Sequence, residues 1–420
     1  MRARVSSEWP WWAGALAGVA LISWLGLQGF AWSDYDSEAS GAFRALSAGD
    51  ITGFLQQVPG YGGSLVLRAP FAATAAALGG GELAVYRAVS IPCLLAVALL
   101  GLVVVRRMGD RGGSTGARAI VLGLCVVNPV TIRGLEMGHP EELLCAALAI
   151  GALLAAIDRR TVLAAVLLGL AIASKSWAVL AIGPVLLALA GHPLRLLALG
   201  IAGAVTAVVL APIVLAGTEG GGGSTLVAAA TTTGQIFHPW HLFWFLGDNA
   251  PGLTGFGGLP LRPGFRAAPE WLMALTHPLI VALVGPLSLG WARVHRAAPR
   301  PGGEQLLLLL ALLLLLRCVL DPWNAVYYEL PFLLALLCWE ALCRPGRPPV
   351  LALGASLANW LTFEVAPGSL SPDMQCVFYL AWSLPLVAWL GREAFASPVR
   401  LARRERRERT RPAPASLQRV

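Results

Sequence analysis

LAVYRAVSIPCLLAVALLGLVVV, residues 83–105, is an apolar run that contains a single charged residue, Arg87. An α-helix of about 20 residues crosses the hydrocarbon core of a bilayer, so this run predicts a transmembrane helix. Arg106 and Arg107 follow it directly. Paired arginines at a helix end are typical of the cytoplasmic side of a membrane.

The composition extends this prediction to the whole protein. Hydrophobic residues make up 57% of the 420 residues, and charged residues only 13%. A soluble globular protein carries about 25% charged residues, so too few remain here to cover a soluble surface. The apolar runs also lack the period of two that a β-barrel requires. We therefore predict an all-α, polytopic transmembrane helical bundle.

About twelve apolar runs are candidate spans. They cover residues 11–32, 83–105, 118–132, 140–157, 161–174, 177–190, 195–215, 271–291, 305–320, 326–343, 350–364 and 375–391. The pair within 161–190 is short enough for two half-helices, and it is the weakest part of this count. Residues 1–395 are predicted to form one transmembrane module, followed by a basic tail at 396–420.

Arginines and histidines follow each even-numbered span, whereas acids and aromatic residues gather in the other loops. The positive-inside rule then predicts a multi-pass protein of the cell membrane with both termini in the cytoplasm. Loops 33–82 and 216–270 would face outward. The basic tail is expected to touch anionic lipid, and we predict no nucleic-acid partner because no nucleic-acid-binding module is visible.

The seven cysteines lack CxxC spacing, which argues against zinc and redox motifs. His139 and Glu142 are three residues apart, but Pro140 disturbs the turn between them. We predict no cofactor and no metal site, with a divalent cation left as an alternative.

The first outer loop places three carboxylates, Asp34, Asp36 and Glu38, where the chain leaves its first apolar run. Ala39, Phe43 and Leu46 have the spacing of an amphipathic helix lying on the membrane surface. A partly desolvated carboxylate has an increased proton affinity and can act as a general base. Ser33 or Asp34 could instead cap a helix that starts near residue 37.

Two segments resemble the GT-C membrane glycosyltransferases. They are SDYDSEASGAFRALSAGD (33–50) and NPVTIRGLEMGHPEELLCAALAIGALLAAIDRRTVLAAVLLGLAIASKSW (128–177). The closest similarity is to an actinobacterial mannosyltransferase-like branch. The resemblance implies a GT-C-like fold over residues 10–340, a polyprenyl-phosphate sugar donor and a glycan or glycolipid acceptor. It also implies an inverting transfer, with Asp34 as the first candidate for the base and Asp36 as the second.

The remaining candidates are substrate contacts near the predicted outer helix ends. They are Glu38, Arg68, Arg133, Glu136, His139, Glu142, Lys175, His238, Trp240, His241, Asp321, Asn324 and Tyr328. The cations among them would bind the leaving phosphate, and the aromatic rings would stack on sugars. Each also has a structural alternative: Lys175 could reach the interface, Arg133 could only orient Glu136, and the aromatic residues could form an interfacial belt. The segment TEGGGGS (218–224) is predicted to be a flexible hinge.

Two other functions stay open on sequence grounds. One is a multi-pass transporter or lipid-linked sugar flippase, which would place ionisable residues at mid-membrane rather than at helix ends. The other is a polysaccharide polymerase or ligase, whose large outer loop usually comes later in the chain, as 216–270 does here.

Overall fold

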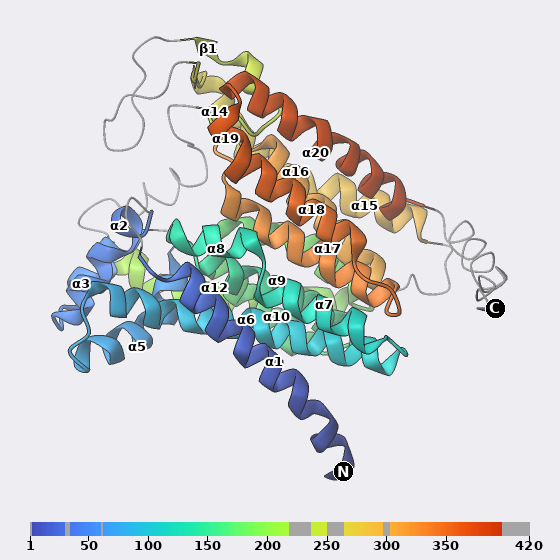
Figure 1. The fold of residues 1–420 in the computed structure, drawn as a ribbon, viewed down its shortest axis with the longest axis horizontal. Helices are drawn as coiled ribbons and strands as arrows, with labels where there is room; N and C mark the ends of the chain where they lie inside the picture. The colour runs from blue at the N-terminus through green and yellow to red at the C-terminus, as the bar shows by residue number, and fades with distance from the viewer. Residues whose placement is uncertain are drawn as a thin grey trace, which may run out of the picture.

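The computed structural model describes residues 2–29, 34–59, 62–217, 237–249, 264–296 and 303–396 (Figure 1). The predicted hinge at 218–224, much of loop 216–270, and residues 397–420 of the predicted tail lie outside these ranges. Within them the chain is helical, apart from the short antiparallel pair of β1 (Asp248–Asn249) and β2 (Arg266–Ala267). The prediction of an all-α protein is confirmed for the described residues.

Helices that precede residue 218 form the first part of the bundle. They are α1 (Arg2–Gly26), α2 (Asp34–Glu38), α3 (Ser40–Ser47), α4 (Ile51–Gln57), α5 (Gly63–Ala77), α6 (Glu82–Asp110), α7 (Thr115–Val126), α8 (Pro129–Glu136), α9 (Glu141–Ile157), α10 (Thr161–Ser174), η1 (Ser176–Ala181), α11 (Ile182–Ala188) and α12 (His192–Ala216).

The second part comes later in the chain. Its elements are η3 (Trp244–Leu246), α14 (Glu270–Ala282), α15 (Val284–Val294), α16 (Glu304–Leu320), η5 (Val326–Glu329), α17 (Leu330–Cys343), α18 (Val350–Trp360), η6 (Leu361–Val365), α19 (Ala366–Ser369) and α20 (Pro372–Ala394).

Seven helical segments of the described chain are long and apolar enough to cross a membrane. They are Glu82–Asp110, Thr115–Glu136, His192–Ala216, Glu270–Val294, Val326–Cys343, Val350–Ser369 and Pro372–Ala394. Each coincides with a predicted span. The other five predicted spans contain α1, α9, α10, η1 with α11, and α16, which fall short of this length or hydropathy. Of the first predicted span, 11–32, residues 11–26 are helical, and 30–32 lie outside the described residues. The protein is thus a multi-helix membrane bundle, and the count of about twelve spans stays a prediction.

Three helices, α9, α16 and α17, form the centre of the bundle. Nearly every residue along them is buried. Helix α9 packs against α6, α10 and α17, and α16 packs against α17 and α20. A helix that is apolar on all sides belongs inside such a bundle. Small residues allow the close approaches: a Cβ on Gly169 of α10 would lie 2.6 Å from the carbonyl oxygen of Ala202 in α12.

The predicted first outer loop, residues 33–82, contains α2, α3, α4 and α5, which gather at one side of the bundle (left in Figure 1). Of the predicted apolar face, Ala39 and Phe43 are buried and Leu46 is half-buried. The alternative that Asp34 caps a helix starting near residue 37 is wrong. Asp34 is the first residue of α2, and its Oδ2 contacts His139 and Tyr327 instead. Ser33, the other candidate for the cap, lies outside the described residues.

Candidate active site

Asp34 is held at the junction of three segments of the chain. Its Oδ2 lies 2.7 Å from Nε2 of His139 and accepts a hydrogen bond from the Tyr327 hydroxyl at 3.0 Å. Its side chain is 30% exposed. The carboxylate is therefore fixed in position and still reachable from outside the protein.

His139 connects this carboxylate to the start of α9. The chain turns at Gly138, which has a φ of +90°, a conformation that favours glycine. Pro140 then precedes the first turn of α9. This turn places Nδ1 of His139 2.7 Å from Oε1 of Glu141, while the ring stacks on Tyr327 with centroids 3.7 Å apart.

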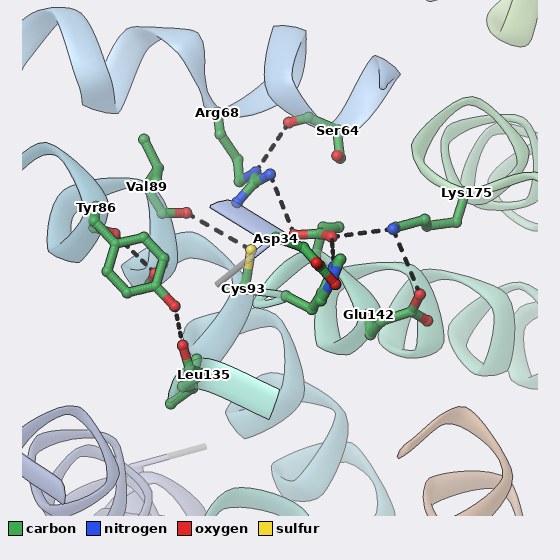
Figure 2. Close-up of polar contacts among 12 residues, drawn as sticks. Asp34, Ser64, Arg68, Tyr86, Val89, Cys93, Leu135, Glu142 and Lys175 are labelled. Carbon is green, nitrogen blue, oxygen red and sulfur yellow. Dashed lines mark hydrogen bonds and ion pairs between the residues drawn. The ribbon is translucent and has the colours of Figure 1, made fainter. Parts of the chain in front are cut away.

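Glu141 is the centre of a buried ionic network. The Lys175 ammonium lies 3.1 Å from its Oε1, and a guanidinium nitrogen of Arg68 lies 3.4 Å from its Oε2. All three side chains are buried or nearly so. Figure 2 shows Arg68 and Lys175 approaching this region from different sides, Arg68 from α5 above and Lys175 from the end of α10 at the right. The pairing compensates for charges that would otherwise be costly to bury.

Glu142 extends the network toward η1. It accepts a hydrogen bond from the Trp177 indole N–H at 2.8 Å, and its other oxygen lies 3.6 Å from Lys175. Lys175 thus bridges the two adjacent acids of α9, as Figure 2 shows for Glu142.

The electrostatics of the pair Asp34–His139 keep both groups charged. Burial opposes ionisation of Asp34, but hydrogen bonds from His139 and Tyr327 and the charge of His139 outweigh it, so the pKa of Asp34 lies below its ordinary value. Burial likewise lowers the pKa of His139, but the charge of Glu141 and the bonds to Asp34 and Glu141 raise it to about 9. At neutral pH the pair is a carboxylate and an imidazolium.

A second group of predicted residues gathers around the segment 321–324. His238 Nδ1 lies 3.0 Å from the carbonyl of Asn324, whose amide donates to the carbonyl of Trp240 at 2.9 Å. Burial lowers the pKa of His241 to about 3, and Asp321 lies 3.4 Å from His277. This group adjoins the first, because Tyr327 and Tyr328 follow in the same segment of the chain.

Four predicted residues stand apart from both groups. Asp36 is exposed, and Glu38 is only half-buried. Arg133 pairs with Glu136 at 3.0 Å and with Glu364 at 3.1 Å, on a partly exposed surface. This geometry corresponds to the orienting role that the sequence left open for Arg133.

Sequence reasoning missed Trp177 as a member of the site, and it missed the contacts that Glu141 and Tyr327 make. The spacing of three from His139 favoured Glu142, but the turn at Gly138 and Pro140 brings Glu141 to the imidazole instead. The motif GHPEE (138–142) carried a signal for Glu141. No signal existed for the contact of Tyr327 with Asp34, which forms only through the packing of distant segments.

No group of three metal-ligating side chains able to hold an ion occurs among the described residues. A separate cavity lies between α1, α6 and α7 and is lined by Trp11, Trp12, Val103, Arg106 and Arg118. None of the predicted site residues borders it.

Part of the chain is similar to a known protein family. Residues 60–191, less than half of the length, match the family model described as Alpha-(1->6)-mannopyranosyltransferase, N-terminal domain. No curated protein matches the chain. The matched segment includes Arg68, His139, Glu141 and Lys175, whereas Asp34 precedes it.

Proposed function

We propose that this chain is a glycosyltransferase of the alpha-(1->6)-mannopyranosyltransferase family, whose model residues 60–191 match, and that it transfers mannose from a polyprenyl-phosphate donor to a glycan or glycolipid on the outer face of the membrane. The match supports the resemblance to a mannosyltransferase branch. The observation that carries the proposal further is the position of Asp34, a partly exposed carboxylate held by His139 and Tyr327.

The transfer we propose is a single inverting displacement. The acceptor hydroxyl oxygen attacks the anomeric carbon of the mannosyl donor and forms the new glycosidic bond. The bond from that carbon to the phosphate oxygen breaks, and its electron pair leaves with the polyprenyl phosphate. The hydroxyl proton passes to Asp34. Because the family name specifies an α-linked product, inversion requires a β-linked donor.

Asp34 suits the role of base better than Asp36. The increased proton affinity expected from partial burial is wrong for Asp34, because its pKa lies below the ordinary value, so its suitability rests on its position rather than on its basicity. His139 and Tyr327 orient it, whereas Asp36 is exposed. A positioned base contributes typically about 10²- to 10⁴-fold to a transfer rate.

The proposal is tested by radiolabel transfer from polyprenyl-phosphate mannose in membranes that contain wild type, Asp34→Asn or Asp36→Asn at equal expression. We expect Asp34→Asn to lower the initial rate by about 10²-fold or more, and Asp36→Asn to stay within a few-fold of wild type. A wild-type protein that transfers no label from this donor would refute the proposed donor. An active Asp34→Asn beside an inactive Asp36→Asn would reassign the base.

The location of the network disfavours the transporter or flippase alternative. Glu141 and Glu142 occupy the first turn of α9, and Lys175 follows the last residue of α10. Ionisable residues on a translocation path lie within the membrane rather than at helix ends.

A further inference from the structure

Arg317 is a buried cation that the site described above does not use. It lies near the C-terminal end of α16, and its side chain is nine-tenths or more buried. Its guanidinium carbon lies 4.2 Å from the ring centre of Tyr328 and 5.3 Å from that of Trp177. Trp177 in turn donates to Glu142, so Arg317 borders the ionic network.

Arg317 has no carboxylate partner within 4.0 Å among the described residues, in contrast to Arg68 and Lys175. Its one described hydrogen bond runs from Nη1 to the carbonyl of Tyr328 at 3.4 Å, a long contact. None of its other nitrogens is both fully buried and without a hydrogen-bond partner. A guanidinium offers five N–H donors, and several of them therefore remain for a ligand.

The nearby acids have other partners. Glu142 contacts Lys175 and Trp177, and Asp321 contacts His277. The charges of both carboxylates act on Arg317, but neither carboxylate lies within ion-pair distance of its guanidinium. Cation–π contact with two aromatic rings stabilises the guanidinium in part, but it does not neutralise its charge.

The charges of the connected network balance without Arg317. Its three acids and three cations are Asp34, Glu141, Glu142, Arg68, His139 and Lys175. Arg317 has no ion-pair partner in this network. The other acids whose charges act on it, Asp321 and Glu329, contact His277 and Tyr379 instead. A phosphodiester that joins a sugar to a lipid carries one negative charge and would pair directly with the guanidinium.

We propose that Arg317 binds the phosphate of the lipid-linked donor, which rests on the proposed function. The planar guanidinium fork would donate to two phosphate oxygens at once. Arg68 and Lys175, the cations that the sequence singles out, would instead hold Glu141 and His139 in place.

The test measures equilibrium binding of radiolabelled polyprenyl monophosphate and of uncharged polyprenol to the purified full-length protein. Arg317→Gln is compared with wild type, and Arg106→Gln is the matched control, because Arg106 is exposed and pairs weakly with Glu8 at 3.5 Å. We expect Arg317→Gln to weaken binding of the phosphate about 10- to 100-fold and to leave polyprenol binding unchanged. Arg106→Gln should bind both ligands as wild type does.

Arg317→Lys keeps the charge but loses the fork, so its affinity should lie between those of wild type and Arg317→Gln. Arg317→Lys also replaces Arg317→Gln in the test if size-exclusion chromatography shows that Arg317→Gln does not fold. Equal affinity of a folded Arg317 variant and wild type for polyprenyl monophosphate would overturn the inference. Equal weakening for polyprenol would do so too, since it would indicate a structural role.

Competition by phosphatidylglycerol vesicles separates two sources of the phosphate. Displacement of polyprenyl monophosphate by phosphatidylglycerol at equal concentration would assign the site to bulk lipid and overturn the inference. Weak competition supports it. A wild-type protein that binds no polyprenyl phosphate would refute the proposed donor itself, so the two failures are distinguishable.

Discussion

At the scale of single residues, the pair Asp34–His139 links the buried ionic network to the proposed base. The imidazole bridges two carboxylates, Asp34 and Glu141, at 2.7 Å each, and this arrangement raises the pKa of His139 to about 9. The histidine therefore serves as a fixed cation rather than as a proton shuttle near neutral pH.

The pH dependence of transfer follows from this pKa. A folded-state pKa above the unfolded value of 6.5 gives stabilisation that is complete below pH 6.5 and is lost as the pH rises through about 9. We expect the transfer rate of wild type to decline above about pH 9, as Asp34 loses its cationic partner. In His139→Gln the alkaline decline should disappear, although the rate is lower throughout. An unchanged alkaline decline in this variant would assign it to another group.

Glu141 makes the most ion pairs in the network, because three cationic side chains contact it. Glu141→Gln leaves Arg68 and Lys175 without their common anion. We expect a loss of about 3 kcal/mol in the free energy of unfolding, measured by denaturation in mixed micelles. Glu136→Gln is the control: its pair with Arg133 is half exposed and should contribute less than about 1 kcal/mol. A similar small loss for both variants would contradict the assignment.

At the scale of elements, α10 matters because its end carries Lys175 and its side lies close to α12. The absence of a side chain at Gly169 allows that approach, and the Thr206 hydroxyl donates to the Gly169 carbonyl at 3.0 Å. We expect Gly169→Val to push the helices apart and to cost about 1–3 kcal/mol of stability. Gly203→Val on α12, where a side chain would meet no atom within 4 Å, is the matched control. The two variants are compared by their midpoints of thermal unfolding in detergent, and only Gly169→Val should have a lower midpoint than wild type.

The sequence predicts these elements better than it predicts the contacts between them. Apolar runs located the helices, because burial in a membrane requires long uncharged segments. The pairing of Lys175 with Glu141 and of Arg68 with the same carboxylate depends on which helix ends meet, and no local spacing encodes that. Tyr327 lies 293 residues from Asp34 along the chain, which puts their contact beyond any motif.

At the scale of the whole molecule, the orientation in the membrane is the prediction that most affects function. If α2 lies on the outer face, an impermeant maleimide should label Asp36→Cys in intact cells. Arg347→Cys, at an exposed position after α17, should react only after the membrane is opened. Labelling of both, or of Arg347→Cys alone, in intact cells would contradict the predicted topology.

The contact between Tyr327 and Asp34 also has a consequence for biosynthesis. The aspartate emerges from the ribosome early, and the phenol that orients it is translated almost three hundred residues later. The contact of Asp34 with Tyr327 therefore forms only once η5 has been synthesised and lies beside α8. If Asp34 is the base that we propose, the nascent chain lacks its oriented base until most of the polypeptide has been made.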